Sequence, residues 1–118
     1  TVGILPKLWP FLQETGVKIS LVAEMDHSAV GFLLGQVYYG EFGLPEAVAI
    51  VDSIGVDPDF RGQKIGRALF NQLKMNLRAL GIEKIQTQVD WNQFGLLEFF
   101  AHQGFAPAQR VCLECTVQ

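Results

Sequence analysis

The chain has 118 residues and a formal net charge of −3 at pH 7, with 49% hydrophobic and 18% charged residues. This length suits one compact core, so we predict a single domain over residues 1–118. The acidic balance disfavours nucleic-acid binding, and no apolar run reaches the roughly 20 residues that span a bilayer. The N-terminus lacks signal-peptide features, so we expect a cytoplasmic protein. The chain starts at Thr1 without Met and its first elements look abrupt, so we expect further N-terminal elements upstream.

The first predicted elements are a short helix and a β-hairpin. Residues 8–12 have helical spacing, which Pro10 restricts to a first turn or a kink and Gly16 ends. Residues 17–25 and 29–39 are rich in Val, Ile, Leu and Tyr, and a turn-prone Asp-His-Ser separates them. That pattern predicts two antiparallel strands.

A third strand is predicted over residues 47–56, and Asp57-Pro58 ends it because proline cannot continue a central ladder. The helix that follows is the clearest element, with Gly81 just beyond its C-terminal cap. Its apolar residues recur at three- and four-residue steps and predict a core face: Ile65, Ala68, Leu69, Leu73, Leu77 and Leu80.

Three further elements are predicted: a strand at 84–90, a helix at 93–103 and a strand at 111–117. Asn92 is the expected N-cap of that helix, and Gly104 its C-terminal glycine. Cys112 and Cys115 would point to opposite faces of the last strand, so we expect neither a disulfide nor a zinc pair. The order of elements predicts an α/β (α+β) sandwich, in which helices flank a mixed sheet.

The turn before the long helix reads Arg61-Gly62-Gln63-Lys64-Ile65-Gly66. Backbone N–H groups at a helix N-terminus can hold an anion such as pyrophosphate, and glycine lets the phosphate approach. Nearby cations can pair with further phosphate charge. Taken alone, the pattern is equally typical of strand-to-helix turns that carry such residues for packing.

Two runs, VDSIGVDPDFRGQKIGRALFNQL and NQFGLLEFFAHQGF, resemble the GNAT superfamily of acyl-CoA-dependent N-acetyltransferases. The resemblance covers the chain from about Val17 to its end. It implies a GNAT-like, mostly antiparallel sheet with a central splay, where the strand at 84–90 parts from the strand at 47–56. It also implies acetyl-CoA as the acyl-donor co-substrate, with no metal.

In that family the segment [RQ]-x-x-G-x-[GA] wraps the coenzyme A pyrophosphate, and the preceding strand pairs with the pantetheine arm. The resemblance thus implies these coenzyme-binding residues: Ile54, Val56, Arg61, Gly62, Gln63, Lys64, Ile65, Gly66, Arg67, Asn92 and Phe100. Lys64 stands where the family usually has its central glycine. We expect an ordinary helical φ there, with the lysine reaching the phosphates; the alternative is that it crowds the loop.

Asp52 is the candidate base, because it precedes Ile54 by two residues and so shares its face in a regular strand. Many relatives carry an acidic residue or histidine there, although a turn cap or a surface ion pair is an equal alternative. By the same likeness, the backbone N–H of Ile54 or its neighbour stabilises the oxyanion. Phe100 replaces a tyrosine that protonates the leaving thiolate in many relatives, and phenylalanine has no hydroxyl.

We therefore predict an N-acetyltransferase that moves an acetyl group from acetyl-CoA to a primary amine by direct attack. The alternatives are a non-catalytic acyl-CoA-binding or regulatory module, which Phe100 and Lys64 favour, and an unrelated α/β domain. The acceptor, a small molecule or a protein N-terminus, stays open, as does a homodimer. A set of acidic residues points to a cationic amine: Glu24, Glu41, Glu46 and Asp52.

Overall fold

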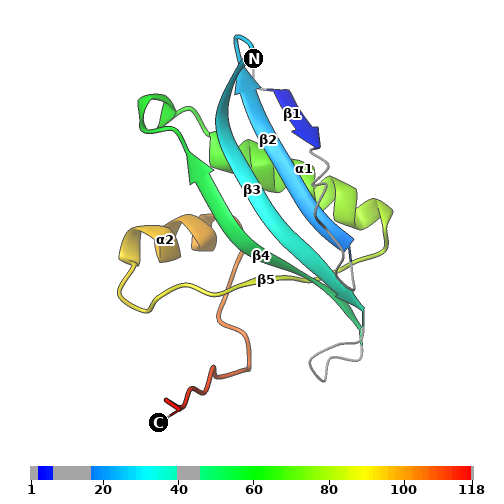
Figure 1. Ribbon diagram of the computed structural model, residues 1–118, viewed down its shortest axis with the longest axis vertical. Helices are drawn as coiled ribbons and strands as arrows, with labels where there is room; N and C mark the ends of the chain where they lie inside the picture. Colours follow the sequence, from blue (N-terminus) through cyan, green and yellow to red (C-terminus); the bar gives the residue numbers. More distant parts are fainter. Residues whose placement is uncertain (1–2, 7–16, 40–45, 118) are drawn as a thin grey trace. The chain divides into compact units, whose positions relative to one another are not determined.

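The computed structural model describes residues 3–6, 17–39 and 46–117, and it divides into two compact units, Thr1–Gln88 and Val89–Gln118. The first unit contains one sheet with the strand order β1-β2-β3-β4-β5. Its strands are β1 (Gly3–Pro6), β2 (Val17–Met25), β3 (Ser28–Tyr39), β4 (Ala47–Val56) and β5 (Ile85–Thr87) (Figure 1). The first four are antiparallel neighbours and β5 is parallel to β4, which confirms the mixed, mostly antiparallel sheet.

The predicted β-hairpin is confirmed. Met25 pairs with Ser28 across a two-residue turn in which Asp26 and His27 have φ of 51° and 66°. Two positive φ angles characterise the turn whose twist matches that of the strands it joins. The short strand β1 was not expected from the sequence, and the helix predicted at 8–12 lies outside the described residues.

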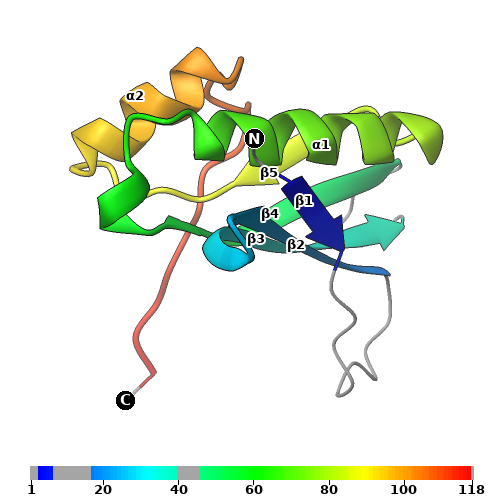
Figure 2. The ribbon, with the colours of Figure 1, turned by 90° about the horizontal axis from the view of Figure 1, so that it is seen from above.

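Helix α1 (Ile65–Ala79) lies along one face of the sheet (Figure 2). Its buried residues include Ile65, Leu69, Phe70, Leu73 and Leu77. Phe70 is fully buried although the predicted core face did not include it, and Leu80, which was predicted to lie in the core, is 61% exposed. The helix ends at Ala79, one residue before Leu80, and the chain turns at Gly81 so that Ile82 is buried instead.

The two faces of the sheet differ. A side chain at Gly31 of β3 would meet Ile65 and Leu69 of α1, so Gly31 and the residues two and four places further along β3 face the helix. The intervening residues point away from α1, to a surface that we call the distal face. On β2 and β3 it includes the cross-strand pairs Lys18–Gln36 and Ser20–Leu34.

The second unit contains α2 (Phe94–His102), which begins one residue later than predicted and has Gln93, not Asn92, as its N-cap. Asn92 instead lies in a turn that the N–H of Gln93 closes by donating to the carbonyl of Asp90 at 3.0 Å. Gly104 follows the cap as predicted, with φ of 95°. Neither α1 nor α2 has the length and apolar character needed to cross a membrane.

The strand predicted at 111–117 is not formed. Val111, Leu113 and Val117 are 82%, 88% and 93% exposed. The residues alternate as a strand does, but a strand also needs a neighbour to complete its hydrogen bonds, and none of the described strands pairs with them. The alternation of apolar and polar residues was therefore not sufficient to predict a strand at 111–117.

Candidate active site

Strand β4 carries a β-bulge at Asp52. Gly35 of β3 pairs with Val51 and the preceding Leu34 pairs with Ser53, so Asp52 lies between two paired residues without a β3 partner of its own. A bulge adds one residue to one strand and changes the direction of the side chains around it. Bulges of this kind are frequent beside active sites, because they redirect a side chain.

The bulge contradicts the expectation that Asp52 and Ile54 share a face. Ile54 pairs with the fully buried Leu33 and so faces α1. The carboxylate of Asp52 lies on the distal face, where its Oδ2 accepts a hydrogen bond from Nε2 of Gln36 at 3.4 Å. Two residues that are two positions apart normally point to the same face of a strand, but Asp52 and Ile54 point to opposite faces because Asp52 is the inserted residue of the bulge.

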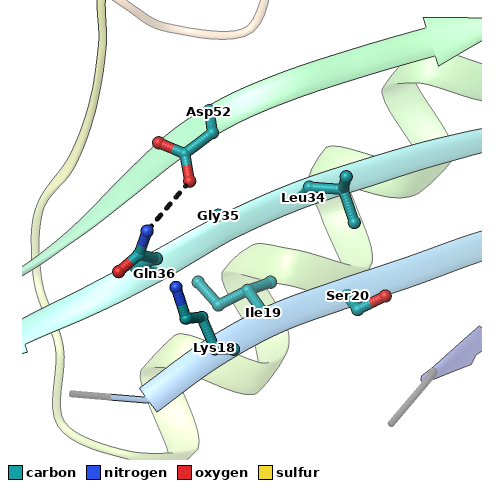
Figure 3. Close-up of a pocket in the computed structure, with 7 residues that line it drawn as sticks. All are labelled: Lys18, Ile19, Ser20, Leu34, Gly35, Gln36 and Asp52. Atoms are coloured by element: carbon teal, nitrogen blue, oxygen red, sulfur yellow. Dashed lines mark hydrogen bonds between the residues drawn. The ribbon is translucent and has the colours of Figure 1, made fainter. Parts of the chain in front are cut away.

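Asp52 lines a pocket of about 160 Å³ on the distal face (Figure 3). The other lining residues come from β2 and β3: Lys18, Ile19, Ser20, Leu34, Gly35 and Gln36. In Figure 3 the amino group of Lys18 and the carboxylate of Asp52 approach Gln36 from opposite sides. Lys18 and Gln36 were not predicted as site residues, because a polar residue within a strand does not by itself indicate a site.

Strand β5 pairs with β4 only from Ala49 to Val51. At the last pair, the hydroxyl of Thr87 donates to the carbonyl of Val51 at 3.0 Å. β4 continues to Val56, and no described strand pairs with its β5-side edge beyond Val51. The predicted splay is thus present, and Ile54 and Val56 lie on the stretch of β4 where an extended ligand can add as a strand.

The turn after β4 is held by Asp57. The N–H of Asp57 donates to the carbonyl of Val30 at 2.8 Å, and the carboxylate of Asp57 accepts from the N–H of Asp59 at 2.9 Å. That carboxylate caps the short 3-10 helix η1 (Pro58–Phe60). The turn therefore has a fixed beginning, and the exposed loop that starts at Arg61 leads from it to α1.

Lys64 is the N-cap residue of α1, and its φ of 60° and ψ of 32° are left-handed. The expected ordinary helical φ is wrong, because the chain must turn in the left-handed region before the helix begins at Ile65. This geometry explains why glycine suits the position. The Lys64 side chain makes no capping hydrogen bond, so it leaves the first-turn amides of α1 uncapped.

The loop has room for an anion. Gly62 has φ of 82°, and apart from Gly62 itself and its two chain neighbours no described residue has a heavy atom within 4 Å of where a Cβ would stand. The exposed residues around the helix start include three cations: Arg61, Lys64 and Arg67. Ile65 and Gly66, the first two residues of the helix, are buried, so the charged side chains around the helix start come from their neighbours. Uncapped amides, positive charge and free space together fit a pyrophosphate.

The remaining two candidates, Asn92 and Phe100, lie in the second unit. Asn92 is exposed, whereas Phe100 is 5% exposed and packs edge-on against Phe99 and Phe105, with ring centroids 5.5 and 5.0 Å apart. The Phe100 side chain is thus part of an apolar cluster in that unit. The coenzyme contacts of both residues stay predictions.

Sequence comparison agrees with this arrangement. The family model of the acetyltransferase (GNAT) family matches residues 5–105, so the chain belongs to that family, as the resemblance indicated. A mycothiol acetyltransferase from Propionibacterium freudenreichii subsp. shermanii is 35% identical over 66 residues. That match covers 56% of this chain and only 20% of the relative's length.

Two solved structures share the fold. Aminoglycoside 6′-N-acetyltransferase AAC(6′)-Ih from Acinetobacter baumannii has a TM-score of 0.80 at 16% identity, covering 100% of this chain and 99% of its own. AAC(6′)-Iy, in complex with the bisubstrate analogue CoA-S-monomethyl-acetylneamine, has a TM-score of 0.79 at 17% identity, with the same two coverages. At these identities the likeness establishes the fold alone.

Proposed function

We propose that this chain transfers an acetyl group from acetyl-CoA to a primary amine. The observation that carries the proposal is that the bulge presents Asp52 directly after Val51, where β5 stops pairing with β4. A carboxylate therefore stands beside an edge that can hold an extended ligand. The loop with the uncapped helix N-terminus follows on the same strand, and the CoA analogue bound to a structural neighbour supports the same co-substrate.

Coenzyme binding is assigned to the loop and to the unpaired edge of β4. The first-turn amides of α1, with Arg61, Lys64 and Arg67, hold the pyrophosphate. The backbone of Ile54 and Val56 bonds the pantetheine arm as a neighbouring strand would. Acetyl-CoA supplies an activated thioester, so this chain needs to bind it, orient it and manage protons.

Asp52 is the proton acceptor in this proposal. A primary amine is mostly protonated at pH 7, and only its free lone pair can attack a carbonyl carbon. Asp52 takes the proton of the ammonium, directly or through water, and so frees the lone pair. The nitrogen then bonds to the acetyl carbon and loses its second proton to water as the carbon–sulfur bond breaks. A backbone N–H near Ile54 donates to the carbonyl oxygen, and the departing thiolate takes a proton from water because Phe100 has none to give.

The second candidate is an acyl-CoA-binding module without turnover. It is favoured by Phe100, which is apolar and buried, and by Lys64, whose side chain occupies the strained N-cap position. Both functions use the same loop and the same edge of β4. They differ only in what happens when an amine is present.

The test separates binding from turnover. Acetyl-CoA should raise the melting temperature of the full chain under both functions, because a ligand that binds only the folded state stabilises it. Release of free coenzyme thiol is then followed with a panel of primary amines and N-terminal peptides. Amine-dependent thiol release supports the transferase, whereas thermal stabilisation without release supports the binding module.

A further inference from the structure

We infer that the pocket beside Asp52 receives an amine that also carries an anionic group, and that Lys18 selects it. The inference rests on the proposed function, since it concerns the acceptor of that reaction. It replaces the expectation, drawn from the acidic residues, of a purely cationic acceptor. Among those residues that the structure describes, Asp52 lines the pocket, Glu24 and Glu46 do not, and Glu46 is paired with Lys84 at 2.7 Å.

The pocket has a charge of each sign at opposite sides. Lys18 on β2 pairs directly with Gln36 on β3, and Gln36 pairs with Ile50 on β4, two residues before Asp52. Neighbouring strands lie about 4.8 Å apart, so the backbones of Lys18 and Asp52 are separated by roughly two strand spacings. The long lysine side chain reaches back across this distance towards Gln36 (Figure 3).

The charge of Lys18 is available to a ligand. Lys18 makes no ion pair with any carboxylate of the described residues, and it is half-buried on the distal face. A partly desolvated cation without a partner attracts an anion more strongly than a fully hydrated one. Lys18 would also repel the second ammonium group of a polycation whose first amine sits at Asp52.

Gln36 orders the site between the two charges. Its Nε2 donates to Asp52, which leaves its carbonyl oxygen as an acceptor for an N–H of the bound amine. The amine then has two oxygen partners, one from Gln36 and one from Asp52. We therefore treat Gln36 as a positioning residue for the carboxylate and the acceptor.

The pocket opens to solvent, so it receives the part of the acceptor that surrounds the amine. About 160 Å³ corresponds to roughly five water molecules at about 30 Å³ each. Between the charges the wall is mostly apolar, with Leu34 and Gly35. Such a space fits a short amine with its anionic group a few bonds away, or the N-terminal residue of an acidic peptide.

Matched amines test this inference on the full chain with acetyl-CoA. The pairs are phosphoethanolamine with ethanolamine and β-alanine with β-alaninamide, and spermidine serves as the polycation. We expect kcat/KM for each anionic member to exceed that of its neutral partner at least tenfold. The Lys18→Met variant should reduce this ratio to about one, and Lys18→Glu should invert it and favour spermidine. Lys84→Met, which removes a lysine outside the pocket, should keep the wild-type ratio.

Calorimetric binding of the same amines, with coenzyme A present, makes the result independent of turnover. If binding discriminates by charge in a Lys18-dependent way but no amine releases thiol, the proposed function fails and the assignment of the pocket stands. If thiol is released with equal kcat/KM for both members of each pair, the function stands and the role of Lys18 is wrong. Melting temperatures of all three variants establish that each is folded.

Discussion

The hydroxyl of Thr87 donates a 3.0 Å hydrogen bond to the carbonyl of Val51 at the last pair between β5 and β4. In a continuing parallel strand, a backbone N–H would supply that donor. Here a side chain satisfies the carbonyl and the ladder stops, one residue before the bulge at Asp52. Thr87 therefore marks the point beyond which no described strand pairs with this edge of β4.

Replacing Thr87 by valine keeps the shape of the side chain and removes the donor. We expect the free energy of unfolding to fall by about 1–2 kcal/mol, because a partly buried carbonyl loses its partner. Thr87→Ser, which keeps the hydroxyl, should lose less. Urea denaturation of the three proteins measures the difference, and equal losses in both variants would show that the hydrogen bond contributes nothing.

Asp52→Asn should lower kcat/KM for amine acetylation by about 10²–10⁴-fold near pH 7, the usual contribution of a general base. Acetyl-CoA should still raise the melting temperature, since the coenzyme residues are unchanged. The loss should shrink towards pH 10, where amines titrate and a larger share of the acceptor is already deprotonated. Asp26→Asn, in the hairpin turn, is the matched control and should retain wild-type activity; a pH-independent loss at Asp52 would argue against a base.

Gly35→Ala should destabilise the chain by about 1–3 kcal/mol through overpacking. The added Cβ would overlap the backbone carbonyl oxygen of Ile50, beside the bulge, where neither strand can move away easily. Gly3→Ala provides the control, because no atom lies within 4 Å of a Cβ at that position. Thermal unfolding of both variants tests the comparison, and a Gly35→Ala protein as stable as Gly3→Ala would contradict the packing at the bulge.

Lys64→Gly should stabilise the ligand-free chain by about 1 kcal/mol, which is the strain of a non-glycine residue in the left-handed region. Lys64→Ala removes the same charge but keeps the strain, so it should not gain stability. Both variants should bind acetyl-CoA less tightly than wild type if the ammonium contacts the phosphates. Equal melting temperatures for the glycine and alanine variants would contradict the strained geometry, and unchanged affinity would exclude the phosphate contact.

Local patterns were sufficient for most of the first unit. The β2–β3 hairpin follows from runs of β-branched and aromatic residues on either side of a turn signal, and α1 follows from helical spacing that ends at Gly81. The loop at 61–66, to which we assign coenzyme binding, stood out by its glycines and cations, and its likeness to the GNAT motif suggested the ligand. These features depend on neighbours in sequence, which a single chain displays directly.

The details that make the site depend on contacts between distant segments. The run from Ala47 to Val56 looks like one regular strand, and only its pairing with β3 reveals Asp52 as an inserted residue. The one feature of the sequence that could have indicated the bulge is the small residue Gly35, which lies opposite Val51 on β3. Likewise, the left-handed Lys64 follows from where the loop must turn to enter α1, and the sequence of the loop alone suggested an ordinary helical start.

The way in which β5 joins the sheet has a consequence for the order of folding. Met25 and Ser28 are close in sequence, so the β2–β3 hairpin can form early. The contact between Thr87 and Val51 joins residues 36 positions apart, so we expect it to form later. β5 is also held by only three residue pairs with β4, so local opening that exposes its amides to solvent should cost little free energy. We therefore expect the amide hydrogens of β5 to exchange with solvent before those of β2 and β3, and we expect the edge of β4 next to β5 to assemble after the hairpin.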